Sequence, residues 1–161
     1  SGRVLYSKSF GSLGCGIGKA IGAYYATRNP VVCMTGDQGL QMNIQELQYV
    51  VQHHLPILIV LLNNNASGMI KDREVSKYGR CLHTTLDSGY DTPNFKALAG
   101  AYRLLYINKV EDISLWDGKP CMMELNTDPD VELTPSLPAG KPVQDMIPLL
   151  ERERYGYLNG L

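Results

Sequence analysis

The fold is decided by residues 31–65, which read VVCMTGDQGLQMNIQELQYVVQHHLPILIVLLNNN. The run Val31–Met34 predicts a short buried strand ending at Gly36-Asp37, and the apolar spacing beyond it predicts a helix over about residues 43–53. Six consecutive aliphatic residues, 57–62, predict a strand buried on both faces, as strands of parallel sheets are. The segment is therefore expected to be a strand–helix–strand unit with parallel strands.

The same alternation of strands and helices continues on both sides of this unit. Glycine-rich residues 11–16 lead into a helix expected over 17–27, and Asp91-Thr92-Pro93 is expected to cap a later helix. The later elements are expected as helices starting near Gly68, over 95–102 and near 110–115, and as strands over 104–107 and 121–125. This order predicts an α/β fold, a three-layer open parallel sheet with helices on both faces.

The length of 161 residues suits a single domain. Residues 1–127 are expected to form that domain, and residues 128–161 an extended, proline-containing tail with a short helix at about 146–153. Charged residues make up 19% of the chain, below the roughly 25% typical of soluble domains. This low fraction suggests a surface that a partner covers.

Composition and charge exclude several classes of protein. A net charge of -1 without a basic cluster argues against nucleic-acid binding, and no apolar run approaches the roughly 20 residues of a membrane span. The four cysteines stand far apart, which predicts reduced core residues in a cytoplasmic protein. The first residues lack an initiator Met and a signal-peptide pattern, so the start resembles a cut end.

Two predicted strand ends carry oxygen ligands for a metal. Asp37 and Asn64 are 27 positions apart, with one crossover between them, so both are expected at the same edge of the sheet. Mg²⁺ is commonly bound by one or two protein oxygens together with phosphates. The backbone N–H groups of Gln38 and Gly39 could point at a phosphate oxygen. Either motif alone is commonly a turn or a polar loop, but the pair predicts Mg²⁺ and, through it, a diphosphate.

The sequence Gly36-Asp37-Gln38, followed by Asn63-Asn64, resembles the signature of the thiamine-diphosphate enzymes, Gly-Asp-Gly and then Asn-Asn. Residues 41–47, Leu55-Pro56 and Gly68-Met69 look like the acetolactate synthase branch. The resemblance covers about residues 7–126. It implies the diphosphate-binding domain of an enzyme that decarboxylates a small 2-oxo acid and ligates carbon to carbon, with thiamine diphosphate and Mg²⁺ as cofactors.

The resemblance also implies the site residues. Mg²⁺ would be bound by Asp37, the Asn64 side chain and the Ala66 carbonyl. Leu13 takes the position of a bulky apolar residue that holds the cofactor folded, with its pyrimidine amino group against thiazolium C2. No residue of this chain is expected to be catalytic. The residues expected to contact the cofactor are Gly11, Ser12, Leu13, Gly36, Asp37, Gln38, Gly39, Asn64, Ala66, Ser67, Gly68 and Met69.

One position departs from the family pattern. The family usually has Gly or another small residue where Gln38 stands, and often a Ser where Gly39 stands. The Gln38 side chain could clash with the diphosphate or replace the missing hydroxyl bond. The resemblance further implies a partner, a pyrimidine-binding domain usually from another subunit of a homo-oligomer. That domain supplies the glutamate that protonates the N1' atom of the cofactor.

Two other functions remain open at this point. A dedicated small subunit of a 2-oxo acid decarboxylase would need a first strand and helix, whereas only ten residues precede Gly11. A non-catalytic module that binds a phosphorylated ligand is the second alternative, and Gln38 is its best support. The sequence does not identify the donor and acceptor substrates.

Overall fold

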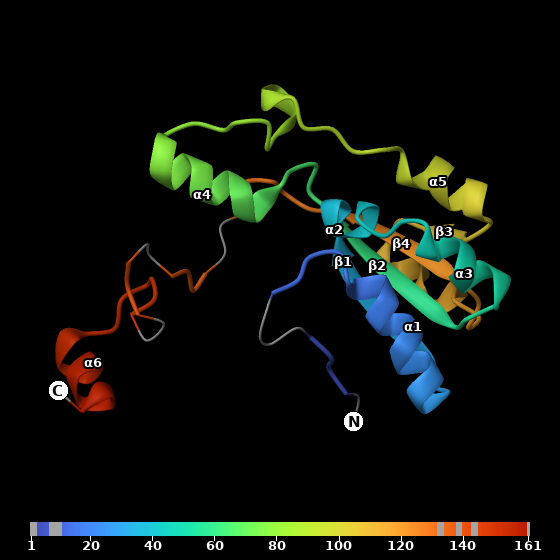
Figure 1. Cartoon of the computed structure of the whole chain (residues 1–161), viewed down its shortest axis with the longest axis horizontal. Coiled ribbons are helices and arrows are strands. Elements are labelled where there is room, and N and C mark those ends of the chain that lie inside the picture. Colours follow the sequence, from blue (N-terminus) through green and yellow to red (C-terminus); the bar gives the residue numbers. More distant parts are fainter. Residues whose placement is uncertain (1–2, 7–10, 132–133, 138–139, 143–144, 161) are drawn as a thin grey trace. The chain divides into compact units, whose positions relative to one another are not determined.

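A computed structural model of the chain describes residues 3–6, 11–131, 134–137, 140–142 and 145–160. These residues divide into two compact units, Ser1–Pro129 and Asp130–Leu161. The first unit contains the sheet and the second contains helix α6 (Figure 1). The expected boundary after residue 127 stays a prediction.

The first unit alternates strands and helices along the chain. Its helices are α1 (Gly16–Thr27), α2 (Asp37–Gln41), α3 (Glu46–Gln52), α4 (Gly68–Tyr78) and α5 (Phe95–Tyr102), with 3-10 helices η1 (Leu86–Ser88) and η2 (Val110–Leu115). Its strands are β1 (Val31–Gly36), β2 (Ile57–Asn63), β3 (Leu105–Ile107) and β4 (Cys121–Asn126). Every pairing is parallel and the order is β1-β2-β4-β3, which confirms the predicted open parallel α/β sheet.

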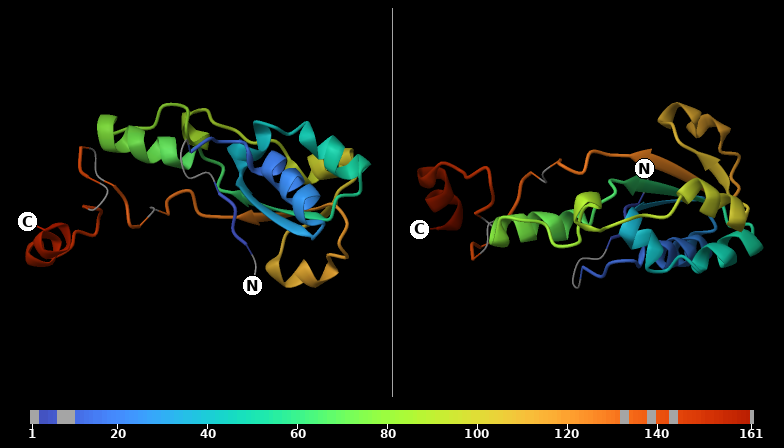
Figure 2. Two further views of the ribbon diagram at one scale, coloured as in Figure 1. Left: turned by 60° about the horizontal axis from the view of Figure 1, so that its bottom comes forward. Right: turned by 90° about the horizontal axis from the view of Figure 1, so that it is seen from above.

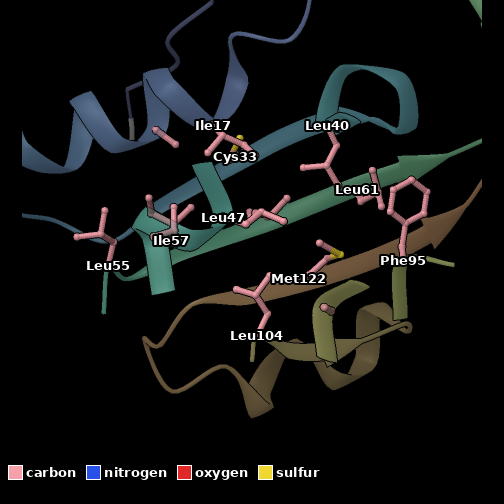
Figure 3. Packing of buried hydrophobic residues seen from close by; sticks show 14 residues of the cluster. Ile17, Cys33, Leu40, Leu47, Leu55, Ile57, Leu61, Phe95, Leu104 and Met122 are labelled. Carbon is pink, nitrogen blue, oxygen red and sulfur yellow. The ribbon is translucent and has the colours of Figure 1, made fainter. Parts of the chain in front are cut away.

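Helices cover both faces of the sheet (Figure 2). On one face α1, α3 and α5 pack a fully buried cluster that includes Leu47, Phe95 and Met122 (Figure 3). On the other face a smaller cluster, with Val60 and Met123, packs against Trp116 at the end of η2. Side chains of a strand alternate between the faces, so an aliphatic run such as β2 is needed to fill both clusters.

The register of the central strands places the loops that carry the predicted site. Gly36 at the end of β1 lies opposite Leu62 of β2. The chain therefore leaves both strands at the same edge, with Asp37 and Gln38 at the start of α2, here called the first loop, and Asn64 in residues 64–67 after β2, the second loop. Parallel strands joined by a crossover must end in this way.

The crossover helix differs from its predicted bounds. Instead of one helix over 43–53, α2 begins directly after β1 and α3 begins only at Glu46. Between the two helices, the Asn43 side chain donates to the Gly14 carbonyl at 2.9 Å. Residues 42–45 between the two helices form turns whose backbone bonds run three positions back, as from the Glu46 N–H to the Asn43 carbonyl at 3.1 Å, so the helix is interrupted there.

Two further predictions are wrong in detail. Helix α5 is capped by Asn94, whose side chain accepts from the Ala97 N–H, and not by Asp91-Thr92-Pro93. The tail helix is α6, Arg152–Asn159, and not residues 146–153. Ile147 instead pairs with Ser136 through two backbone hydrogen bonds, and Pro148 beside it has no N–H for a helix.

Candidate functional site

Asp37 is a buried carboxylate with one unpaired oxygen. It follows Gly36, is 2% exposed and opens α2. Its Oδ1 accepts from the Gln38 N–H at 2.5 Å and from the Tyr90 hydroxyl at 3.1 Å. Its Oδ2 is buried and has no hydrogen-bond partner in the described part of the chain. Both donors on Oδ1 are neutral, and a buried charge without compensation is costly, so the arrangement favours a cation at Oδ2.

The second loop presents the amide and carbonyl oxygens. The Asn64 Oδ1 accepts from the Ala66 N–H at 3.1 Å, which turns the chain sharply after β2. Asn65, between them, has a φ of 50°, a left-handed conformation that Asn tolerates. An amide oxygen has two lone pairs, so Asn64 Oδ1 keeps one for a cation.

A network across the sheet holds this second loop. Asn63, 5% exposed, donates from Nδ2 to Glu124 Oε1 at 2.7 Å and accepts the Asn65 N–H at 3.1 Å. Tyr106 of β3 donates to Glu124 Oε2 at 2.6 Å, and burial together with this carboxylate raises the pKa of Tyr106 to about 12. Three neighbouring strands thereby fix the residue that precedes Asn64. Such supporting bonds keep ligands in place.

The Gln38 side chain joins the two loops. Its Oε1 accepts from the Ser67 hydroxyl at 2.8 Å, and Ser67 is 6% exposed. Its backbone N–H donates to Asp37 Oδ1, and its expected contact with a phosphate stays a prediction. A Cβ at Gly39 would lie 2.9 Å from Thr35 Oγ1, so a Ser there would require Thr35 to move. One of the two departures from the family pattern, Gln38, thus supplies a hydrogen bond between the loops.

The glycine-rich segment before α1 presents Leu13. Gly11, Ser12 and Leu13 are exposed, with Leu13 at 58%. Gly14 has a φ of 76°, and a Cβ there would lie 2.6 Å from Met42 Cβ, so this position requires glycine. Together with the Asn43 bond, this close approach fixes the segment against the turn between α2 and α3.

The predicted residues Gly68 and Met69 open α4. A Cβ on Gly68 would lie 3.0 Å from Asn64 Nδ2, so the glycine lets the helix start close to the amide. Met69 is exposed on the first turn. The Gln38–Ser67 bond brings the first and second loops together at one sheet edge, while no hydrogen bond among the described residues joins Leu13 or Met69 to Asp37 or Asn64.

Tyr90 is the site residue that sequence reasoning missed. It lies after η1, in the loop that precedes α5, and nothing in the loop's composition marks it. Burial, and then the charge of Asp37, raises the pKa of Tyr90. The hydroxyl therefore stays protonated and remains a donor throughout the physiological range of pH.

The donor set fits Mg²⁺ better than a softer metal. The described residues contain no group of three or more His, Cys, Asp and Glu side chains that could hold a metal. One carboxylate oxygen, one amide oxygen and a backbone carbonyl are hard oxygen ligands, which suit Mg²⁺ when phosphates complete the octahedron. The buried, unpaired Oδ2 of Asp37 is the observation on which this fit rests.

Comparisons with known proteins point to the same cofactor. A family model described as the thiamine pyrophosphate enzyme, C-terminal TPP binding domain, matches residues 1–115. The acetolactate synthase large subunit of Porphyra purpurea is 33% identical over 158 residues, covering 92% of this chain and 26% of that protein. The acetolactate synthase isozyme 3 large subunit of Escherichia coli K12 is 41% identical over 102 residues, covering 62% of this chain and 17% of that protein.

A solved structure agrees with these sequence relatives. The thiamine diphosphate-dependent 4-hydroxybenzoylformate decarboxylase of Rhodococcus jostii RHA1 superposes with a TM-score of 0.60 at 26% identity, covering 73% of this chain and 24% of that one. The chain thus spans about a quarter or less of the length of these relatives. Among the residues that the structure describes, no helix has the length and apolar character needed to cross a membrane.

Proposed function

Because this chain belongs to the thiamine pyrophosphate enzymes, as their C-terminal TPP-binding domain in an acetolactate synthase-like branch, we propose that Asp37, Asn64 and Ala66 bind Mg²⁺. The ion would join the loops after β1 and β2 to the diphosphate of the cofactor. The unpaired Oδ2 of buried Asp37 carries the proposal, since a cation there compensates a charge that the protein leaves unbalanced. Asn64 Oδ1 and the Ala66 carbonyl would be the other protein ligands.

The cofactor supplies an electron sink for the carbon–carbon bond next to a 2-oxo group. This chain's own residues bind and orient it. The two loops hold the diphosphate through the metal, and Gly11, Ser12 and Leu13 form an exposed platform on which the rings would lie. In this division of roles, the partner domain carries out the proton transfer.

A calorimetric titration of the full-length protein tests the proposal. We expect thiamine diphosphate to bind in the presence of Mg²⁺ and to lose its affinity when EDTA removes the metal. Titration with ADP and other nucleotides tests the alternative, in which the protein is a non-catalytic module that binds any phosphorylated ligand. Binding of nucleotides as tight as that of thiamine diphosphate would favour the alternative.

We further propose that the whole protein decarboxylates a small 2-oxo acid and ligates the product, together with a pyrimidine-binding domain from another subunit of a homo-oligomer. The relatives named acetolactate synthase support this activity. Val32 and Met34 of β1 are apolar but 56% and 67% exposed, which supports a surface that the partner domain covers. The four free cysteines suit a reducing, cytoplasmic location.

Leu13→Ala tests the platform. We expect cofactor affinity to stay within about tenfold, or roughly 1.4 kcal/mol, while turnover falls further, because the change disturbs ring geometry and leaves the diphosphate contacts intact. Titration and steady-state kinetics on the full-length enzyme measure the two effects. Equal losses of affinity and turnover would mean that Leu13 only packs.

Gln38→Ala tests whether the glutamine supports or obstructs cofactor binding. We expect affinity for thiamine diphosphate to fall about fivefold, since the variant loses one hydrogen bond between the loops, worth about 1 kcal/mol. Ser67→Ala removes the other end of the same bond and is the matched control. The double variant should lose no more than either single one. Tighter binding by Gln38→Ala would show that the side chain obstructs the diphosphate.

A further inference from the structure

Residues 84–92 form a segment that is bonded to both metal-site loops. On the second loop, the Ser67 N–H donates to the Thr84 carbonyl at 2.9 Å, and Ala66 and Thr85 form an antiparallel bridge. The Thr92 hydroxyl donates to Asn65 Oδ1 at 2.6 Å. The segment is therefore attached at both of its ends to the loop that carries Asn64.

The same segment reaches the first loop through one side chain. The Tyr90 hydroxyl donates to Asp37 Oδ1 at 3.1 Å. Oδ1 also accepts the Gln38 N–H, so two donors determine the rotation of the carboxylate about χ2. Oδ2 is left as the atom without a partner. Removing the hydroxyl would leave the Gln38 N–H as the single donor to Oδ1 among the described residues.

Tyr90 is itself held by the backbone of the segment. Its N–H donates to the Thr85 carbonyl at 2.9 Å, and Thr85 shares a capping box with Ser88 around η1. Glu74 of α4 accepts from the Thr84 hydroxyl at 2.7 Å and from the Leu82 N–H at 2.8 Å. These bonds support the Tyr90 ring through its backbone, as a group that orients a metal ligand must be supported.

We propose that Tyr90 is a positioning residue of the metal site, whose hydroxyl turns the Asp37 carboxylate so that Oδ2 faces the cation. The inference rests on the proposed Mg²⁺ function and adds to it a residue outside the Gly-Asp and Asn-Asn motifs. Cation binding and the order of the 84–92 segment are then linked, because each stabilises the carboxylate position that the other requires. Tyr90 contacts neither substrate nor cofactor in this role.

Tyr90→Phe in the full-length protein provides the test, because it removes the hydroxyl and keeps the ring. The measurement is the Mg²⁺ concentration that gives half-maximal binding of thiamine diphosphate. Calorimetry without substrate monitors this binding. We expect this concentration to rise about tenfold, equivalent to about 1.4 kcal/mol. At saturating Mg²⁺ the affinity for thiamine diphosphate should stay within about twofold, and the variant should still unfold cooperatively in EDTA, which shows that it is folded.

Tyr78→Phe is the matched control, since it makes the same chemical change on an exposed face of α4. It should leave the Mg²⁺ requirement as in the wild type. The inference is overturned if Tyr90→Phe shows the wild-type Mg²⁺ requirement, or if it weakens cofactor binding equally at saturating Mg²⁺. If the wild type itself binds thiamine diphosphate without Mg²⁺, the proposed function fails, and that outcome is distinct from a failure confined to Tyr90.

Discussion

Asp37→Ala in the full-length protein is expected to abolish Mg²⁺-dependent binding of thiamine diphosphate. The variant removes the single carboxylate among the proposed ligands, and a hard cation depends strongly on a charged oxygen. We expect a loss of at least about 100-fold in affinity, or about 2.7 kcal/mol. Calorimetric titration with thiamine diphosphate at a series of Mg²⁺ concentrations measures it.

Two controls separate the charge from the shape of the site. Asp37→Asn keeps an oxygen that can accept from the Gln38 N–H and the Tyr90 hydroxyl but has no charge, so it should lose nearly as much affinity as the alanine variant. Asn64→Ala removes a neutral ligand and should cost less, about tenfold. An Asp37→Ala protein with wild-type affinity for Mg²⁺ and thiamine diphosphate would disprove the assignment of the metal site.

The 161-residue chain alone is expected to have no turnover with pyruvate, Mg²⁺ and thiamine diphosphate. It provides the proposed metal site and ring platform, whereas the glutamate that protonates N1' is expected from the pyrimidine-binding domain. Glu124 does not replace it, because both of its oxygens already accept hydrogen bonds. Glu46 begins α3, on the crossover between the two loops. Glu124 is thus already engaged and Glu46 lies in the diphosphate-binding half, so neither is expected to act as the missing acid.

The assay needs evidence that the chain is folded. Circular dichroism with a cooperative thermal transition would provide it, and the full-length protein assayed in parallel is the positive control. Binding of thiamine diphosphate without turnover would agree with the division of roles between the two domains. Turnover by the isolated chain at roughly 1 to 10³ s⁻¹, the scale of whole enzymes, would contradict it.

The sequence alone determined the alternation of strands and helices and the sheet edge at which the proposed site lies. The aliphatic run 57–62 favours burial on both faces, and the structure buries all of it except Leu62, so the run indicated a central parallel strand. Once that strand is parallel to β1, a crossover brings Asp37 and Asn64 to the same edge. These conclusions depend on local pattern and chain connectivity, which a sequence contains in full.

Only the tertiary structure decided which groups complete the site. Tyr90 reaches Asp37 across 53 positions, Ser67 reaches Gln38 across 29, and Glu124 reaches Asn63 across 61. A side chain that bonds to a distant residue leaves no periodicity in its own segment, so no pattern marked these contacts. The interruption of the crossover helix before Glu46 was missed as well, and the Asn43 side chain there bonds to Gly14 across 29 positions. Hydrogen bonds between distant residues depend on how the elements pack, and that packing is settled only when the whole chain is folded.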